Sequence, residues 1–238
     1  MTAAGVAAAV FFDAGNTLLT PYPSVSAVVR QILAEAGHIH DLDAIDELMP
    51  LVDEFYKDRY RADDTFWTSE EETSQVWVGM YSLLCRKLGI HEQAETIALR
   101  VYDEFGHSSR WRLFDDVVPC LTRLRAAGSK IAVISNWDRR LETILGGLGL
   151  TDLLDATLSS AAVGLHKPDP RIFEEACRRL AVKPEECVHV GDHYYADYLG
   201  ASAVGMKAVL IERVAGACPA PEATTISTLD DLEVALTR

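Results

Sequence analysis

Polar side chains that can take part in catalysis follow the ends of apolar segments at several points in this sequence. They are Asp13, Ser135, Asn136, Lys167, Asp192 and Asp197. Together they offer a carboxylate, a hydroxyl, an ammonium group and a further pair of carboxylates. If the fold brings them to one place, this set suits phosphoryl transfer, in which catalysis depends on positioning and on neutralising charge.

The charge of a phosphoryl group explains why each of these residue types is needed. The group carries about −1.5 to −2 charges, so a carboxylate such as Asp13 can attack it only if cations neutralise its oxygens. Lys167 is one such cation. Mg²⁺ is the other, because it prefers oxygen ligands and binds through one or two carboxylates, here Asp13 and Asp192.

Continuous apolar runs of strand length predict a buried parallel sheet. They cover residues 6–12, 130–135, 186–191 and 206–211. Apolar residues at helical spacing lie between and after them, at 117–127, 139–148, 171–180, 196–204 and 229–236. Alternating strands and helices predict an α/β fold with a doubly wound parallel sheet. An Ala- and Pro-rich surface loop is expected at 215–225, before the last helix.

The segment from residue 20 to residue 110, called the helical insert below, has a different pattern. Helical periodicity covers residues 24–36, 41–60, 70–89 and 92–105, and no strand-like apolar run interrupts it. We therefore predict a discontinuous α/β core made of residues 1–19 and 111–238, with residues 20–110 as an inserted α-helical cap. Ligands of such sheets bind at the carboxyl ends of the strands, so this insert would cover the site.

Composition excludes several kinds of partner. The formal net charge of −14 disfavours nucleic acid and anionic membrane surfaces, and it leaves a small phosphorylated metabolite dependent on local cations. The five cysteines show no Cys-x-x-Cys spacing, which predicts reduced core thiols and a cytoplasmic location. We expect no signal peptide and no membrane span. No motif specifies an oligomeric state.

Four ordered motifs resemble those of the haloacid dehalogenase superfamily, in the subgroup whose helical cap follows the first motif. They are Phe12-Asp13 with Thr17-Leu18, Ile134-Ser135-Asn136, Lys167-Pro168-Asp169-Pro170, and Gly191-Asp192 with Asp197. The resemblance implies a Rossmann-like core and a nucleophilic Asp13 that forms an aspartyl-phosphate. It also implies substrate binding by Ser135, Asn136 and Lys167, and a Mg²⁺ site made of Asp13, the Gly15 backbone carbonyl, Asp192 and Asp197, with Asp197 either a direct ligand or a support for the other ligands.

Gly15 departs from the pattern of phosphatases in this family, which place a general acid–base aspartate two residues after the nucleophile. Loss of such a group costs about a hundred- to ten-thousand-fold in rate. One interpretation is a phosphatase for acyl or aryl phosphates, whose leaving groups need little protonation. A variant of it takes the proton from His193, Tyr194 or His166.

Two other classes of function stay open at this point. Haloacid dehalogenases and phosphonatases also lack the second aspartate, although Asp192 argues against a metal-independent dehalogenase. A phosphonatase would require a cap lysine, for which Lys57 and Lys87 are the candidates. Alternatively, the chain is a catalytically impaired relative that binds a metabolite or protein. Trp67 and Trp77 of the helical insert could then form the binding surface, although their helical spacing favours the core.

Overall fold

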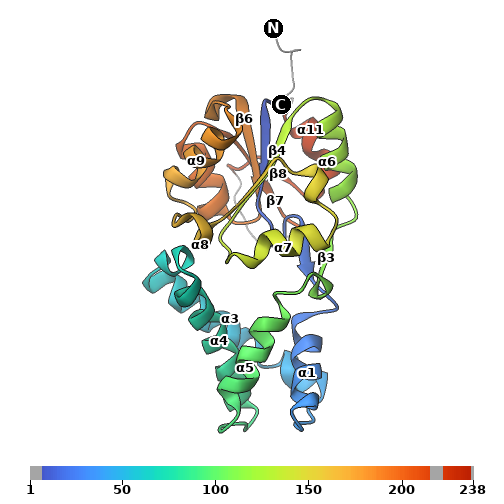
Figure 1. Cartoon of the computed structure of the whole chain (residues 1–238), viewed down its shortest axis with the longest axis vertical. Helices are drawn as coiled ribbons and strands as arrows, with labels where there is room; N and C mark the ends of the chain where they lie inside the picture. The colour runs from blue at the N-terminus through green and yellow to red at the C-terminus, as the bar shows by residue number, and fades with distance from the viewer. Residues whose placement is uncertain (1–6, 215–221, 237–238) are drawn as a thin grey trace.

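The computed structural model describes residues 7–214 and 222–236, which form a parallel sheet flanked by helices and a separate helical lobe (Figure 1). The six strands of the sheet lie in the order β5-β4-β1-β6-β7-β8. In chain order they are β1 (Ala9–Phe12), β4 (Lys130–Ser135), β5 (Ala156–Ser159), β6 (Cys187–Gly191), β7 (Lys207–Ile211) and β8 (Thr225–Ile226). The α/β doubly wound parallel sheet predicted from the sequence is confirmed.

Helices cover both faces of this sheet. They are α6 (Val117–Ala126), α7 (Arg140–Gly147), α8 (Ser160–Val163), α9 (Pro170–Leu180), α10 (Gly200–Ala203) and α11 (Leu232–Leu236). Successive residues of β1 point to opposite faces, as strand geometry requires. Val10 and Phe12 pack in the apolar cluster that holds α6 and α7, whereas Phe11 packs in the one that holds α9. All four residues of β1 are buried, which explains its uninterrupted apolar sequence.

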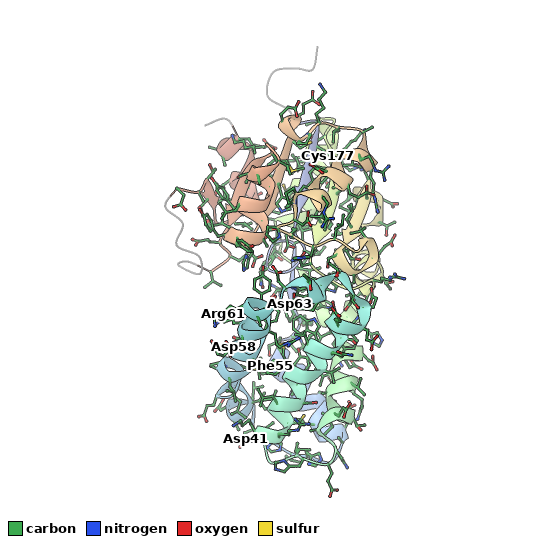
Figure 2. All side chains as sticks on the ribbon, turned by 90° about the vertical axis from the view of Figure 1, so that its left-hand side faces the viewer. Asp41, Phe55, Asp58, Arg61, Asp63 and Cys177 are labelled. Carbon is green, nitrogen blue, oxygen red and sulfur yellow. The ribbon has the colours of Figure 1, made fainter. Side chains whose placement is uncertain are left out.

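Between β1 and β4 the chain leaves the sheet through a two-stranded antiparallel ribbon and forms a bundle of helices. The ribbon pairs β2 (Leu19–Pro21) with β3 (Trp111–Leu113). The bundle contains α1 (Val25–Glu35), α2 (Leu42–Asp46), α3 (Met49–Ala62), α4 (Glu70–Lys87) and α5 (Ala94–Glu104). It has its own apolar core, separate from those of the sheet. Figure 2 shows Phe55 and Arg61 on this bundle, and Cys177 on α9, which packs on the sheet.

Local sequence signals set the ends of several helices. The side chain of Ser24 accepts a hydrogen bond from Ala27 N at the start of α1, and that of Ser69 accepts one from Glu72 N at the start of α4. Asp169 caps α9 in the same way, and Pro170 occupies the first turn of that helix. Such side chains satisfy backbone donors that lack a partner within the helix.

Short elements at the margins of the sheet differ from the sequence prediction. β5, with the sequence Ala-Thr-Leu-Ser, lies at one edge and shows no apolar run, and the ribbon strand β2 extends into the segment predicted to be purely helical. Thr225 begins β8, so the loop predicted at 215–225 ends earlier, and its residues 215–221 lie outside the described part of the chain. Edge and ribbon strands are exposed on one side, which removes the continuous apolar signal.

Four cysteines, Cys85, Cys120, Cys177 and Cys187, are buried free thiols, as predicted, and Cys218 lies outside the described residues. In residues 7–214 and 222–236 no helix combines the length and the apolar character needed to cross a membrane.

Arg213, just after β7, ties the loop that follows β1 to the start of α6. Its guanidinium group donates to the backbone oxygen of Thr17 at 2.7 Å and forms an ion pair with Asp116. Asp116 also accepts hydrogen bonds from the Thr228 hydroxyl and from Leu229 N. This network fixes the loop that carries the first motif against the sheet.

Candidate active site

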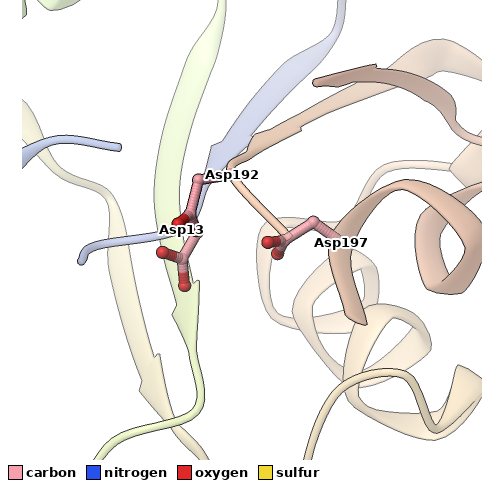
Figure 3. A group of neighbouring side chains, drawn as sticks. All are labelled: Asp13, Asp192 and Asp197. Carbon is pink, nitrogen blue, oxygen red and sulfur yellow. The ribbon is translucent and has the colours of Figure 1, made fainter. Parts of the chain in front are cut away.

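The candidate catalytic side chains meet at the carboxyl edge of the sheet. β1 lies between β4 and β6, so the residues that follow these three strands converge there. Asp13 follows β1, Ser135 ends β4, and Asp192 follows β6. Such a point, where the strand order changes direction, is where parallel α/β sheets bind ligands. Figure 3 shows the carboxylates of Asp13, Asp192 and Asp197 directed toward one another.

The buried ammonium group of Lys167 links two of these carboxylates. Its Nζ donates to Asp13 Oδ1 at 2.6 Å and also to Asp197 Oδ1, and the side chain is 2% exposed. The Ser135 hydroxyl donates to the same Asp13 oxygen at 2.9 Å. Among the hydrogen bonds of the described residues, none reaches Asp13 Oδ2. Asp13 is therefore held in one orientation through Oδ1, with its second oxygen available.

Burial and charge have opposing effects on the pKa values of this network. Burial acts to lower the pKa of Lys167, but Asp13 and Asp197 outweigh it and raise that pKa, so the amine stays protonated. Burial acts to raise the pKa of Asp197, yet Lys167 and His189 keep it below its usual value. For Asp13, burial raises the pKa and Lys167 opposes the rise. Removing one member of such a buried pair would leave an uncompensated charge.

Protein donors already occupy the carboxylate of Asp197. Besides Lys167, it accepts hydrogen bonds from His189 Nε2 at 2.8 Å and from His193 N at 3.0 Å. It also packs so closely on β6 that a Cβ atom added at Gly191 would lie 2.1 Å from its Cγ, which makes a glycine necessary there. This geometry favours a role for Asp197 in holding Lys167 rather than in coordinating a metal directly.

The family resemblance implies that Asn136 binds substrate, but in the structure its side chain contacts the backbone of Lys167. Its side-chain oxygen accepts from Lys167 N at 2.7 Å, and its amide nitrogen donates to Lys167 O at 2.9 Å. Both polar ends of the Asn136 side chain therefore fix the backbone that presents the lysine. The sequence could not have revealed this pairing, because 31 residues separate the two positions.

An excess of negative charge marks the place where a cation would bind. Asp13, Asp192 and Asp197 can each offer one carboxylate oxygen so that all three atoms lie within 4.8 Å of one another. Burial, with repulsion from Asp13 and Asp197, raises the pKa of Asp192 to about 8. The Asp192 carboxylate accepts a long hydrogen bond, 3.3 Å, from Asn16 Nδ2. The carboxylates of Asp13 and Asp192, which protein donors leave largely unoccupied, are oxygen donors of the kind that Mg²⁺ prefers, whereas the oxygens of Asp197 already accept protein hydrogen bonds.

Comparison with known proteins identifies the family. The sequence model of a family described as haloacid dehalogenase-like hydrolase matches residues 7–205. The chain belongs to the haloacid dehalogenase-like hydrolases. The match extends from β1 to the end of α10, so it includes all four motifs and the helical insert.

Two curated relatives of this haloacid dehalogenase-like hydrolase show the range of similarity. Human haloacid dehalogenase-like hydrolase domain-containing protein 3 is 49% identical over 48% of the chain and 46% of its own length. Glyceraldehyde 3-phosphate phosphatase from Methanopyrus kandleri is 33% identical over 56% of the chain and 58% of its own length. The chain thus matches about half the length of each.

Two solved structures resemble the haloacid dehalogenase-like hydrolase over nearly its whole length. A 2-haloacid dehalogenase from Pseudomonas syringae has a TM-score of 0.67 at 26% identity and covers 98% of the chain and 99% of its own. A phosphatase of the family from Thermococcus onnurineus has a TM-score of 0.64 at 26% identity, covering 96% and 97%. Their similar scores mean that the fold does not separate dehalogenase from phosphatase.

The candidate substitutes for the missing acid lie in different surroundings. Of His193, Tyr194 and His166, His193 alone lines the cavity above Asp13 in the described structure. Burial lowers the pKa of His193, and its Nδ1 accepts a hydrogen bond from Ala196 N, so that nitrogen has no proton to donate. Tyr194 donates to Glu222, and His166 faces Asp64. None of the three therefore presents an available proton donor to the cavity from a position that these contacts support.

Several residues of the site went unnoticed in the sequence. Trp137 and Asp138 follow the second motif directly and line the cavity, and Arg140 forms an ion pair with Asp138. The Tyr102 hydroxyl of α5 donates to Asp138 at 3.1 Å, which connects the helical insert to the sheet. Their position directly after Ser135-Asn136 was the available signal, because a loop at the carboxyl edge of β4 must face the site.

We expect Asp192→Asn to stabilise the metal-free protein in a pH-dependent way. Because folding raises the pKa of Asp192 to about 8, the wild-type protein loses stability as the pH rises from the unfolded value, about 3.9, toward 8. Asparagine carries no charge, so its advantage should grow from about 1 kcal/mol at pH 5 to an upper limit of about 5 kcal/mol at pH 8.5, seen as a larger gain in Tm at the higher pH.

Thermal unfolding in EDTA at the two pH values measures this difference. The exposed Asp152→Asn is the matched control and should leave Tm unchanged at both pH values. An equal change for Asp192→Asn at pH 5 and pH 8.5 would contradict the electrostatic account.

Proposed function

We propose that the chain is a Mg²⁺-dependent phosphohydrolase that acts on a small phosphorylated substrate through an aspartyl-phosphate on Asp13. The observation that carries the proposal is the Asp13 carboxylate, held through one oxygen by Lys167 and Ser135 beside the carboxylate of Asp192. A buried carboxylate with a positioned ammonium and hydroxyl suits nucleophilic attack on an anionic group.

We assign the metal ligands to Asp13, Asp192 and the backbone carbonyl of Gly15. The raised pKa of Asp192 supports this assignment, because burial and its carboxylate neighbours disfavour the ionised carboxylate, which a bound cation would stabilise. When bound, Mg²⁺ would neutralise phosphate oxygens. Asp197 would act through Lys167, since its own oxygens already accept protein hydrogen bonds.

In the proposed reaction, an oxygen of Asp13 attacks phosphorus, the new P–O bond forms, and the bond to the leaving oxygen breaks. The leaving group departs with the electron pair and takes its proton from solvent. Water then attacks the same phosphorus, the P–O bond to Asp13 breaks, and inorganic phosphate and the free carboxylate result. The ammonium of Lys167 and the hydroxyl of Ser135 would bind phosphate oxygens as charge moves onto them.

We further propose that residues 20–110 form a cap over a core of residues 1–19 and 111–238. Support comes from the separate apolar core of the helices and from side chains of α3, α4 and α5 that line the cavity above Asp13. A cap in this place would exclude water from the reacting group.

The phosphatase proposal is better supported than the other chemistries of the family. Lys57 and Lys87, the candidates for a phosphonatase Schiff base, are both exposed and are not among the described residues that line the cavity. The relative named glyceraldehyde 3-phosphate phosphatase adds support for a phosphorylated substrate. A binding module would have no need of a buried carboxylate oriented by two donors.

Asp13→Asn should abolish Mg²⁺-dependent hydrolysis of 4-nitrophenyl phosphate, with a loss in kcat of at least about a thousandfold, because an amide cannot attack phosphorus. Release of inorganic phosphate measures the rate, with the exposed Asp115→Asn as a matched control that keeps full activity. Retention of activity in folded Asp13→Asn would remove Asp13 from the mechanism.

Gly15→Asp should restore the missing acid. A Cβ atom at this position would lie 3.4 Å from Trp137 Cζ3, an ordinary contact distance, so the first side-chain atom fits. We expect turnover of glyceraldehyde 3-phosphate to rise by about tenfold or more, and that of 4-nitrophenyl phosphate to change much less. An alkoxide is the poorer leaving group and gains more from protonation.

Steady-state kinetics on the two substrates checks this prediction. Gly15→Asn, which has similar size but no acidic proton, is the control and should give no gain. Equal gains on both substrates for Gly15→Asp would contradict the missing-acid account.

A further inference from the structure

A cavity of about 390 Å³ opens directly onto Asp13, and many aromatic side chains line it. Its volume falls within the range of sites that enclose small organic molecules. On the side of the helical insert, Tyr56, Tyr60, Trp67 and Trp77 form one wall of it, and Tyr81, Tyr102 and Phe105 of the insert also line it. The helical spacing of Trp67 and Trp77 predicts that both side chains pack in the core of the insert. In the structure they belong to the apolar core of the insert and also border the cavity.

The aromatic rings of this wall form a continuous surface. Tyr56 stacks on Trp77 with ring centroids 6.0 Å apart and planes at 19°, and Trp67 meets Tyr56 edge-on at 6.3 Å. Tyr60 lies 6.0 Å from Tyr56 and 5.8 Å from the ring of His193, which follows Asp192. The wall therefore extends from the interior of the insert to the loop that bears the candidate metal ligand.

A second aromatic group reaches the position where the family's general acid would stand. Trp137 lies against Gly15, and Trp111 packs on Trp137 with centroids 4.9 Å apart. Phe105 continues the group at 5.7 Å from Trp111. All three residues line the cavity. The indole ring of Trp137 therefore borders the space that an aspartate side chain at position 15 would occupy.

Charges elsewhere in the cavity are paired. Apart from the catalytic cluster, the charged residues among its described lining are Asp138 and Arg140. Arg140 donates to both oxygens of Asp138, at 2.9 and 2.6 Å, and lies over the ring of Tyr102 at 3.6 Å. No cation in this lining is left to bind an anionic leaving group. The buried Tyr60 hydroxyl, in contrast, has no hydrogen-bond partner among residues 7–214 and 222–236 and can donate to a polar atom of a ligand.

We propose that this cavity is a leaving-group subsite for a planar aromatic ring, so that the preferred substrates are aryl phosphates with extended or fused rings. This inference rests on the proposed phosphohydrolase function and narrows its substrate class. Flat π-systems gain from offset and edge-on contacts with aromatic walls, which a small acyl or sugar group cannot make. An aryloxide also departs without a proton donor, which matches glycine at position 15.

Binding to the turnover-deficient Asp13→Asn protein with Mg²⁺ present tests the subsite separately from catalysis. Isothermal titration calorimetry would compare 2-naphthyl phosphate, phenyl phosphate and acetyl phosphate. Naphthol and phenol have closely similar acidity, so a difference between the first two reports ring size alone. We expect 2-naphthyl phosphate to bind about tenfold or more tightly than phenyl phosphate, and acetyl phosphate to bind most weakly.

Variants of the aromatic wall locate the effect. Tyr56→Leu or Trp77→Leu in the same background should weaken 2-naphthyl phosphate by about tenfold and acetyl phosphate by less than twofold. Phe55→Leu is the matched control, since Phe55 precedes Tyr56 on α3 (Figure 2) and is not among the residues that line the cavity. It should leave both affinities unchanged.

Failure of the subsite and failure of the proposed function give different results. Equal binding of naphthyl and phenyl phosphates, no binding of any of the three compounds, or equal losses in Phe55→Leu and Tyr56→Leu would overturn the aromatic subsite. Hydrolysis that persists in Asp13→Asn would overturn the mechanism. A naphthyl preference that depends on Tyr56 and Trp77 would still support the subsite, because it is measured without turnover.

Discussion

The interaction on which the site depends is the buried contact of one ammonium group with two carboxylates. Lys167 joins Asp13 to Asp197, and Asn136 fixes its backbone through a reciprocal pair of hydrogen bonds. The partners come from separate segments at the carboxyl edge of the sheet, the loops that hold Asp13, Asn136 and Lys167 and the helical segment that holds Asp197, so the pairing fixes those segments relative to one another. A buried ion pair of this kind persists only where its geometry and hydrogen bonds offset the loss of hydration.

The same contact sets the electrostatics of the whole site. Lys167 compensates part of the charge of Asp13 and Asp197, while burial and repulsion from these two carboxylates raise the pKa of Asp192 to about 8. The net charge of −14 opposes the approach of a phosphate, so binding depends on local cations. Lys167, together with a metal at Asp13 and Asp192, would supply that positive charge at the base of a cavity lined by many aromatic residues.

Much of this arrangement could be predicted because strand ends carry a clear signal. Asp13 and Asp192 each follow an apolar run buried on both sheet faces, and the long helices of the insert show amphipathic spacing. The roles of Asn136 and Asp197 could not be predicted in detail, since both depend on contacts across 30 or more residues. Periodicity also cannot distinguish an aromatic residue that fills a core from one that borders a cavity, as Trp67 and Trp77 do.

Trapping with beryllofluoride tests most directly whether Asp13 is the nucleophile. This anion mimics a phosphoryl group bound to a carboxylate, and ¹⁹F NMR together with a crystal structure can locate it. The account predicts an adduct on an Asp13 oxygen that forms only with Mg²⁺ and is contacted by Lys167 and Ser135. Absence of an adduct at every Mg²⁺ concentration, or an adduct on another side chain, would contradict it.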